Sequence, residues 1–380
     1  MLKRIEIKNF RSCHDVVLDD LGPLTVLVGR NAAGKSNILR AISWLANTAT
    51  SLVSPSGSEL GFAPAGVSLQ VSLGRDVYDY SLEAKYQYSA KPGSNIDIVE
   101  VLHHQNGDGA RKQVFTTQEG KVLLDDGRTI IIGSSTPCMP ALVSVMPPNS
   151  DTVRLIRPLL STVEAIRYYP LSVEGEGDYR YPIVRHSDYS EWLARHSGTG
   201  SLGTAVVMRL LDMRLTREDQ FNEVRDLLGP NGLGLVNDIH VEQHKPASQK
   251  EEDWWYSLRF QPSDDPALSV GFPDLSSGTQ RLVGIVTSLI YDQSAVMLLE
   301  HPEDGIHRAL LRKLIGLLQT YSDQSQLIIA SHSAVVFNTV TPGAIRLVTL
   351  EHGATKLRAL TQKELQVAAR YLEDAKSRII

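Results

Sequence analysis

Apolar and polar residues alternate at the start of the chain, where Leu2–Ile7 has the period of two expected of a half-buried strand. Val16–Leu18 is a second short apolar run, and Leu24–Val28 is a continuous one, which predicts a buried strand. Asn37–Ala46 predicts an amphipathic helix, because its large apolar residues recur at helical spacing: Ile38, Leu39, Ile42 and Leu45. The chain therefore opens with strands that lead into a strand, a loop and a helix.

The pattern changes after about residue 50. Residues 51–66 are rich in Ser, Gly and Pro, which predicts a loop. Val67–Leu73 then alternates cleanly and Tyr78–Tyr88 loosely, with glycine-containing turns farther on. We expect an antiparallel β region inserted over residues 51–149.

Helical periodicity follows over residues 151–228, in segments that Pro158 and later prolines and glycines are expected to break. Ala205–Leu228 contains the longest amphipathic stretch. We expect a helical insertion over residues 150–235. Val236–Val241 and Trp254–Phe260 have the pattern of a strand pair.

The last third of the chain contains two continuous apolar runs, Ala295–Glu300 and Gln326–Ala330, each near a helical pattern. Such runs are typical of parallel strands covered on both faces. Ala344–Leu350 predicts a closing strand, followed by a terminal helix. The predicted fold class is α/β, with a mixed, mostly parallel core sheet built from residues 1–50 and 236–380.

Composition narrows the class of protein. Hydrophobic residues make up 42% and charged residues 21% of the 380 residues, as in ordinary globular proteins. The net charge of −5 gives no overall attraction to nucleic acid or to an anionic membrane, so a DNA contact needs a local patch or a partner. Cys13 and Cys138 are too few for a disulfide framework or a structural zinc site. No apolar run approaches the roughly 20 residues of a membrane span. We expect a cytoplasmic protein without a membrane partner.

One motif carries specific chemistry. Its eight residues fit G-x-x-x-x-G-K-[ST] at every fixed position: Gly29, Arg30, Asn31, Ala32, Ala33, Gly34, Lys35 and Ser36. Between a strand and a helix, such a loop presents backbone N–H groups to a phosphate chain. Lys35 is expected to reach the β- and γ-phosphates, and the Ser36 hydroxyl to hold Mg²⁺. The alternative is a chance match in a glycine-containing turn, which the flanking elements disfavour.

Four further segments carry polar residues at the ends of predicted elements or between them. Leu275–Arg281 places Ser276, Ser277 and Gly278 at a helix start, which is either a second anion site or only a capped helix. Ala295–Glu300 is an apolar run that ends in a carboxylate, the Walker B pattern. Gln326–Ser333 is another buried strand and ends at His332. Asn9–Ser12 is, on its own, a polar turn with one anchoring Phe.

In this order the motifs resemble those of the ABC-type ATPase head, a P-loop NTPase fold, and more closely those of SMC, RecF and OLD ATPases. The segments that carry the resemblance are Asn9–Ser12, Gly34–Asn37, Glu300–His307 and Ser331–Ser333. Within that branch, the chain is most similar to the compact ATPases of bacterial anti-phage systems, such as the PtuA and AriA types. The motifs lie toward both ends of the chain, and the resemblance covers little of the middle.

The resemblance implies that two heads dock head-to-tail around ATP and Mg²⁺, as a homodimer or a higher homo-oligomer. Gly29–Asn37 would bind the phosphates in their own chain, with Arg11 or Ser12 near the phosphates or the base. Ser276, Ser277 and Gly278 would close on the γ-phosphate of the other chain. Glu300 would be the carboxylate on the Mg²⁺ side, and His332 the switch histidine. The glutamine of the family's Q-loop cannot be placed.

One position departs from the family pattern. Members usually carry Glu-Glu-Pro or Asp-Glu-Pro, whereas this chain has Glu300-His301-Pro302, so a histidine stands where the second acid would polarise the attacking water. An imidazole can act as a base, so loss of activity does not follow. One hypothesis is slow hydrolysis and a long-lived ATP-bound assembly; the other is that His301 or Glu303 supports ordinary turnover.

Three functions compete at this point. The first is an ATP-dependent switch or scaffold in a prokaryotic anti-phage complex whose separate effector subunit, expected to be a nuclease, does the cutting. The residues after His332 leave no room for a nuclease domain in this chain. The second is a RecF-like DNA-repair ATPase that binds duplex DNA; direct contact with DNA or RNA stays open. The third, a transporter ATPase, is disfavoured by the long insertions.

Overall fold

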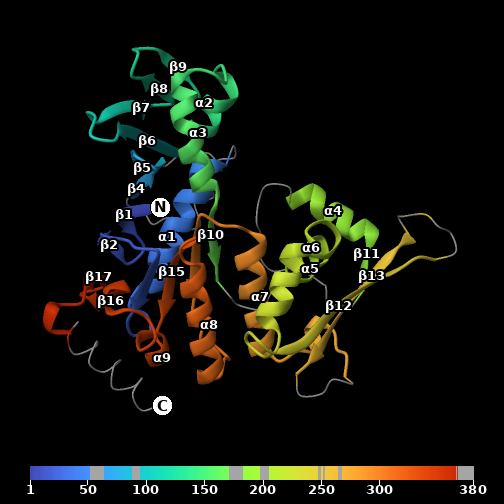
Figure 1. Cartoon of the computed structure of the whole chain (residues 1–380). Helices are drawn as coiled ribbons and strands as arrows, with labels where there is room; N and C mark the ends of the chain where they lie inside the picture. The colour runs from blue at the N-terminus through green and yellow to red at the C-terminus, as the bar shows by residue number, and fades with distance from the viewer. Residues whose placement is uncertain are drawn as a thin grey trace. The chain divides into compact units, whose positions relative to one another are not determined.

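The computed structural model describes residues 1–51, 64–87, 95–170, 183–196, 205–246, 250, 253–263, 268–364 and 366 (Figure 1). Residues 52–63 of the predicted loop, the end of the strand at Tyr88 and most of the predicted terminal helix lie outside these residues, whereas Ala65 and Gly66 of the predicted loop belong to a strand. Contacts divide the chain into two compact units. Unit 1 comprises Met1–Tyr168, Ser294–Glu300 and Ser322–Ile380, and unit 2 comprises Tyr169–Gln293 and His301–Tyr321.

Unit 1 contains the core sheet. Its six strands lie in the order β10-β14-β15-β3-β16-β17, with β14, β15, β3 and β16 parallel and β17 antiparallel to β16. The strand bounds are β3 Leu24–Val28, β10 Ile166–Tyr169, β14 Val296–Glu300, β15 Gln326–Ser331, β16 Ile345–Glu351 and β17 Ala354–Ala359. β14 and β15 are buried at every position, as the continuous apolar runs predicted. The prediction of a mixed, mostly parallel α/β core is confirmed.

The second sheet of unit 1 has eight antiparallel strands in the order β2-β1-β4-β5-β6-β7-β8-β9. The bounds are β1 Leu2–Phe10, β2 Cys13–Leu18, β4 Ala65–Leu73, β5 Asp76–Gln87, β6 Asn95–Asn106, β7 Lys112–Gln118, β8 Lys121–Leu124 and β9 Thr129–Ile131. The segments of β1 and β2 were predicted to belong to the core sheet, but they belong to this antiparallel sheet. The reason is the pairing of β1 with β4, which joins segments about sixty residues apart and leaves no trace in local periodicity.

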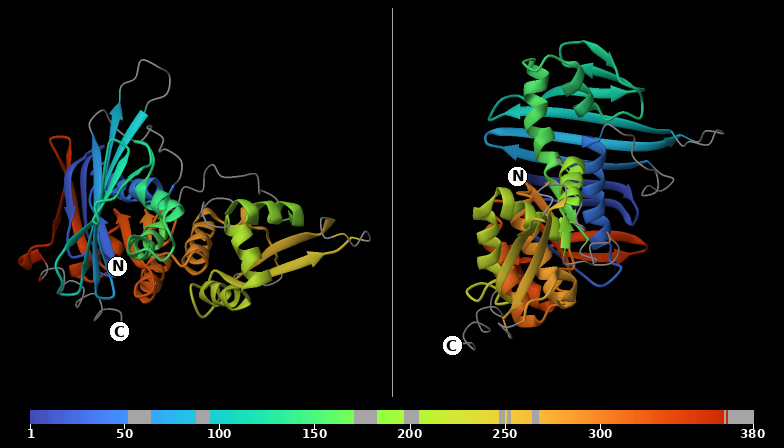
Figure 2. Two further views of the ribbon diagram at one scale, coloured as in Figure 1. Left: turned by 90° about the horizontal axis from the view of Figure 1, so that it is seen from above. Right: turned by 90° about the vertical axis from the view of Figure 1, so that its right-hand side faces the viewer.

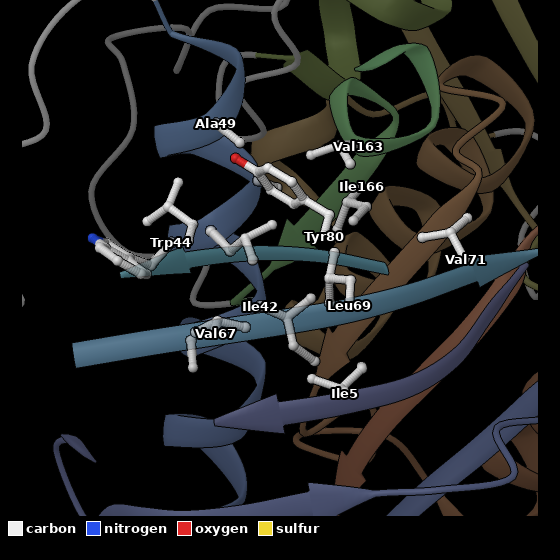
Figure 3. Packing of buried hydrophobic residues seen from close by; sticks show 14 of the residues in the cluster. Ile5, Ile42, Trp44, Ala49, Val67, Leu69, Val71, Tyr80, Val163 and Ile166 are labelled. Atoms are coloured by element: carbon white, nitrogen blue, oxygen red, sulfur yellow. The ribbon is translucent and has the colours of Figure 1, made fainter. Parts of the chain in front are cut away.

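Helix α1 (Lys35–Thr50) packs against the antiparallel sheet through β1 and β4, and also contacts core strands β14 and β15. Figure 3 shows Ile42 and Trp44 of α1 among Ile5 of β1 and Val67 and Leu69 of β4. All five side chains are buried, and burial of each large apolar side chain stabilises the fold by about 1.5–3 kcal/mol. The helix that begins at the glycine loop is therefore anchored by both sheets.

Helices α2 (Cys138–Val145) and α3 (Asp151–Glu164) pack with α1 and complete this core (Figure 2). The prediction that Pro158 breaks the helix is wrong, because α3 continues through it. Pro158 lies on the exposed side of α3, while the apolar stripe of the helix is buried: Val153, Ile156, Leu159, Leu160 and Val163. Burial of that stripe outweighs the hydrogen bond that Pro158 cannot make.

Unit 2 contains five helices and a three-stranded sheet in the order β11-β13-β12 among the described residues. The bounds are β11 Ile183–Arg185, α4 His186–His196, α5 Ala205–Thr216, α6 Glu218–Leu228, β12 Val236–His244, β13 Trp255–Pro262, α7 Ser277–Tyr291 and α8 Arg308–Tyr321. Helices α5, α6 and α7 pack on one another. The remaining elements are the short helix α9 (Ala334–Phe337) in unit 1 and the 3₁₀ turns Phe272–Asp274 and Pro342–Ala344.

The predicted boundaries at 149 and 235 differ from this division, since α3 and β10 up to Tyr168 belong to unit 1 and unit 2 begins at Tyr169, the last residue of β10. None of the described helices is long and apolar enough to cross a membrane.

Candidate nucleotide-binding site

The glycine loop connects β3 to α1 in unit 1. Gly34 precedes the first residue of the helix with φ 101, a left-handed conformation that L side chains rarely adopt. A Cβ on Gly34 would lie 1.9 Å from Thr355 Oγ1, and one on Gly29 would lie 2.2 Å from the Val348 carbonyl oxygen. Both glycines of the motif are therefore required by close approach of the rest of unit 1, independently of any ligand.

A polar cluster supports the loop. Ser12 Oγ accepts a hydrogen bond from Asn37 Nδ2 at 2.8 Å and lies 2.7 Å from Thr355 Oγ1. Thr355 Oγ1 donates to the Ala33 carbonyl oxygen at 3.1 Å, and its backbone N–H donates to the Ser12 carbonyl oxygen. Two of the residues expected at the nucleotide, Ser12 and Asn37, thus hold the loop in shape. Thr355 was missed, because only tertiary structure brings β17 to the loop.

Lys35 is buried, and its ammonium group donates to the carbonyl oxygens of Gly29 and Arg30 at 2.9 and 3.0 Å. The tip of the loop is exposed at Arg30, Asn31 and Ala32, and Ala32 has φ 63. The lysine side chain therefore curls over its own loop, beside the exposed tip. Arg11, also expected near the nucleotide, is exposed, with its guanidinium carbon 5.7 Å from the centroid of the Phe10 ring.

The candidate metal ligands come from the same edge of the core sheet. β3, β15 and β14 are parallel neighbours, so their carboxyl ends lie along one edge. That edge carries the glycine loop with Ser36 after β3, His332 after β15 and Glu300 at the end of β14. A serine hydroxyl and a carboxylate supply the oxygen ligands that Mg²⁺ prefers. The donor set therefore fits a magnesium–nucleotide site.

Glu300 is 8% exposed, and its Oε2 accepts a hydrogen bond from the Tyr168 hydroxyl at the edge strand β10. Arg40 Nε, on α1, lies 3.4 Å from the same hydroxyl oxygen. Burial, together with the hydrogen bond to Glu300, raises the pKa of Tyr168 to about 12, so the phenol is a donor at neutral pH. The contact of Tyr168 with Glu300 was not predicted, since nothing in the local sequence pattern distinguishes Tyr168 from a packing residue.

His301 begins the segment of unit 2 that follows Glu300 along the chain. Its backbone has φ 48, and its Nδ1 lies 3.6 Å from Glu303 Oε1. The Asp304 N–H donates to the His301 carbonyl oxygen at 3.2 Å, which closes a tight turn. His301 and Glu303 are thus side-chain neighbours. His332, in unit 1, is exposed just before the N-cap of α9, Ser333.

The predicted signature segment is the start of α7. Ser276 is the N-cap: its Oγ accepts from the Thr279 N–H at 3.2 Å, and Ser276 and Ser277 are exposed. Gly278 is buried, and a Cβ there would lie 2.2 Å from the Gly305 carbonyl oxygen. In the isolated chain, helix capping explains the serine at 276, and the close approach of Gly305 explains the glycine at 278. Ser276 and Ser277 are nevertheless exposed to solvent.

Comparison with known proteins finds similar ATPases. Two family models match: "AAA ATPase domain" over residues 1–108, and "AAA domain, putative AbiEii toxin, Type IV TA system" over residues 203–338. An OLD nuclease of Thermus scotoductus is 62% identical over 42 residues, 11% of this chain and 8% of that protein. A RecF protein of Lactococcus lactis subsp. cremoris is 53% identical over 47 residues, 12% and 13% of the two chains. These matches span about an eighth or less of the relatives' length.

Among solved structures, an SMC head bound to the C-winged helix domain of ScpA aligns with 96% of this chain and 99% of its own. The TM-score is 0.50 at 13% identity, so the likeness shows the fold alone. With the glycine loop and the strand that ends in Glu300 on one sheet, the fold is that of an ABC-type P-loop ATPase head. The family models and the short matches to OLD and RecF proteins make the chain similar to ATPases of the SMC/RecF/OLD branch, and the two ATPase family models support ATPase activity in general.

Proposed function

We propose that the chain binds ATP with Mg²⁺ at the edge of the core sheet and hydrolyses it. The observation that carries this proposal is the left-handed glycine loop with a buried Lys35, on the same edge of the sheet where β14 ends in Glu300. The first N–H groups of α1 would bind phosphate oxygens, and Lys35 would leave the carbonyls of Gly29 and Arg30 to contact the β- and γ-phosphates.

Ser36 and Glu300 would hold the metal ion. When bound, Mg²⁺ would neutralise charge that develops on the phosphates. The protein's own contribution is to fix the two oxygen ligands, one at the start of α1 and one at the end of β14, in a sheet whose strands β14 and β15 are fully buried.

His301 is our candidate for the group that accepts the proton of the attacking water, with Glu303 beside it. A neutral imidazole can act as a base, and Glu303 Oε1 lies 3.6 Å from His301 Nδ1. We propose that turnover is slow, since a positioned general base typically contributes about 10²–10⁴-fold and histidine replaces the usual acid. Ordinary turnover supported by His301 or Glu303 is the competing outcome.

We further propose that ATP joins two copies of the chain, with Ser276, Ser277 and Gly278 of one copy facing the glycine loop of the other. The exposure of both serines supports this, because a phosphate from outside the chain can reach them. The slow, ATP-bound assembly would act as a switch in a prokaryotic anti-phage complex with a separate nuclease-like effector. The description of the family model over residues 203–338 and the short match to an OLD nuclease support a defence role.

The test is affinity purification of the full chain from its native host, with and without ATP, followed by native mass spectrometry. The proposal predicts an ATP-dependent dimer or larger assembly that contains a second, nuclease-like protein. A chain that stays monomeric with ATP contradicts the switch. Strong salt-dependent binding of duplex DNA by the chain alone favours the RecF-like alternative, for which the RecF matches give some support.

A further inference from the structure

Two consecutive tyrosines end β10, and each donates a hydrogen bond to a different carboxylate. The Tyr168 hydroxyl donates to Glu300 Oε2 in unit 1. The Tyr169 hydroxyl donates to Asp292 Oδ2 at 2.5 Å in unit 2, at the C-terminal end of α7. Successive side chains on a strand point to opposite sides, so neighbours in the sequence serve different acids. Of these two carboxylates, Glu300, the partner of Tyr168, is the one that we place at the nucleotide.

The surroundings of Tyr168 connect the acid to the helix of the glycine loop. Arg40 follows Ser36 by four positions on α1, so the two side chains lie on one face of the helix. Arg40 Nε lies 3.4 Å from the Tyr168 hydroxyl oxygen, which in turn contacts Glu300. The contacts therefore run from the helix that carries Ser36, through one phenol, to the carboxylate at the end of β14.

A carboxylate at a strand end can rotate about its terminal torsion, which is broad and roughly two-fold. A hydrogen bond to a carboxylate is stronger than one between neutral groups and can select one orientation. Tyr168 occupies Oε2 and sets the plane of the carboxylate. The same contact fixes the direction in which Oε1 presents its lone pairs.

We propose that Tyr168 is a positioning residue that orients Glu300 toward the Mg²⁺ held with Ser36. This inference rests on the proposed magnesium–nucleotide site. Tyr168 touches neither nucleotide nor metal in this account; it acts through Glu300. Removal of its hydroxyl should weaken the coupling between Mg²⁺ and nucleotide and leave the metal-independent phosphate contacts of the glycine loop intact.

The chain offers a matched control. Tyr169→Phe removes the same atom one residue away and also leaves a carboxylate without its tyrosine donor. Asp292 retains its ion pair with Arg209 at 2.9 Å, and neither residue is among those that we assign to the nucleotide. A general effect of a lost tyrosine hydroxyl on β10 would appear in both variants, whereas a positioning effect would appear only in Tyr168→Phe.

The experiment measures equilibrium binding of a fluorescent ATP analogue to the full chain over a range of Mg²⁺ concentrations and in EDTA. For Tyr168→Phe we expect the Mg²⁺ concentration at half-maximal enhancement of binding to rise about tenfold, which corresponds to about 1.4 kcal/mol. Affinity in EDTA should stay within about twofold of wild type. Tyr169→Phe should match wild type in both conditions.

A double-mutant cycle with Glu300→Gln separates positioning from structure. If Tyr168 acts through Glu300, then Tyr168→Phe should add no further change in Mg²⁺ dependence once Glu300→Gln is present. Wild-type Mg²⁺ dependence in Tyr168→Phe, or equal shifts in both tyrosine variants, would overturn the inference while the nucleotide site stands. Absence of Mg²⁺-dependent binding in the wild-type chain would instead overturn the proposed function, and this inference with it. Thermal unfolding of each variant shows whether it is folded. If Tyr168→Phe folds poorly, the Mg²⁺ dependence of nucleotide binding by Glu300→Gln alone measures what the loss of a correctly oriented carboxylate does, and wild-type Mg²⁺ dependence in that variant would overturn the inference.

Discussion

The helix starts at α1 and α7 both carry a glycine and a serine, but they satisfy their N–H groups in different ways. At α1 the N-cap is Gly34, in a left-handed conformation and with no side-chain capping bond. At α7 the N-cap is Ser276, whose hydroxyl accepts from the Thr279 N–H. The α1 start therefore has no side-chain acceptor of its own, as our proposed phosphate site requires, whereas α7 already has an internal acceptor and would exchange it to bind an anion.

A third helix start sharpens the contrast. The first residue of α2, Cys138, donates its N–H to Oε2 of Glu100, a fully buried carboxyl group on β6 that also accepts from the Tyr80 hydroxyl. Burial, only partly offset by these two hydrogen bonds, raises the pKa of Glu100 to about 7. The chain thus closes one helix start with a buried carboxyl, one with an exposed serine and leaves one without a side-chain cap.

The largest effect is expected on ATP affinity, from a substitution at the start of α1, which has no side-chain cap. Gly34→Ala forces a Cβ into a left-handed position 1.9 Å from Thr355 Oγ1, so the loop must change shape. We expect a loss of more than about 100-fold in affinity for ATP with Mg²⁺, measured by titration calorimetry. Gly22→Ala is the control, since the nearest atom to its Cβ is 3.9 Å away. An ATP affinity of Gly34→Ala equal to that of the control would contradict the role of the loop.

The next effect concerns the buried cap of α2. Because the pKa of Glu100 is raised from 4.5 to about 7 on folding, the folded state retains this proton to higher pH than the unfolded chain. The contribution of Glu100 to stability is therefore highest below pH 4.5, falls as the pH rises to 7 and is constant above that. The predicted loss is at most about 3 kcal/mol.

Urea unfolding of wild type and Glu100→Gln at several pH values measures this effect as the difference between the two chains. The difference isolates Glu100 from the other carboxylates. A difference that does not change between pH 4.5 and 7 would show that the group keeps its ordinary pKa.

An intermediate effect is expected at the loop after β14. Replacement of His301 by Glu restores the acid that relatives carry, and we expect steady-state ATP turnover to rise by about tenfold or more. His301→Gln is the control for the left-handed backbone at this position, φ 48, because it is not a base. Turnover of His301→Glu that does not exceed wild type would remove the slow-switch hypothesis.

The smallest effect belongs to the capped start of α7. Loss of the Ser276 cap in Ser276→Ala should lower the free energy of unfolding by about 1 kcal/mol, without changing ATP affinity in the monomer. If the serine also faces the glycine loop of a second copy, ATP-dependent self-association should weaken as well, which light scattering reports. Ser161→Ala is a control on the exposed side of α3. Weaker ATP binding by dilute Ser276→Ala would place the residue at the nucleotide of its own chain.

Local pattern predicted those parts of the molecule that local physics determines. Strand β3, the loop and the apolar face of α1 could be predicted because a continuous apolar run, two glycines and helical spacing each have one favoured structure. The buried strands β14 and β15 were predicted for the same reason. Pro158 shows the limit: its local preference against a helix interior was overridden by the buried stripe on the opposite side of α3.

Residues that act through long-range contacts were not predictable. Tyr168 and Thr355 reach the candidate site from β10 and β17, and their sequence neighbours give no indication of Glu300 or of Ala33. The sheet to which β1 belongs depends on its pairing with β4, which again is a contact between distant segments. The roles of His301, His332 and the two serines at α7 remain predictions, because they depend on nucleotide and a second copy of the chain.

The most direct test is equilibrium binding of ATP with Mg²⁺ to the dilute chain, compared between wild type and Lys35→Ala. If the uncapped start of α1 is the phosphate site, wild type should bind one nucleotide per chain, and Lys35→Ala should bind at least about 100-fold more weakly. Equal affinity of the two chains, or no binding by either, would contradict the assignment of the glycine loop as the nucleotide site.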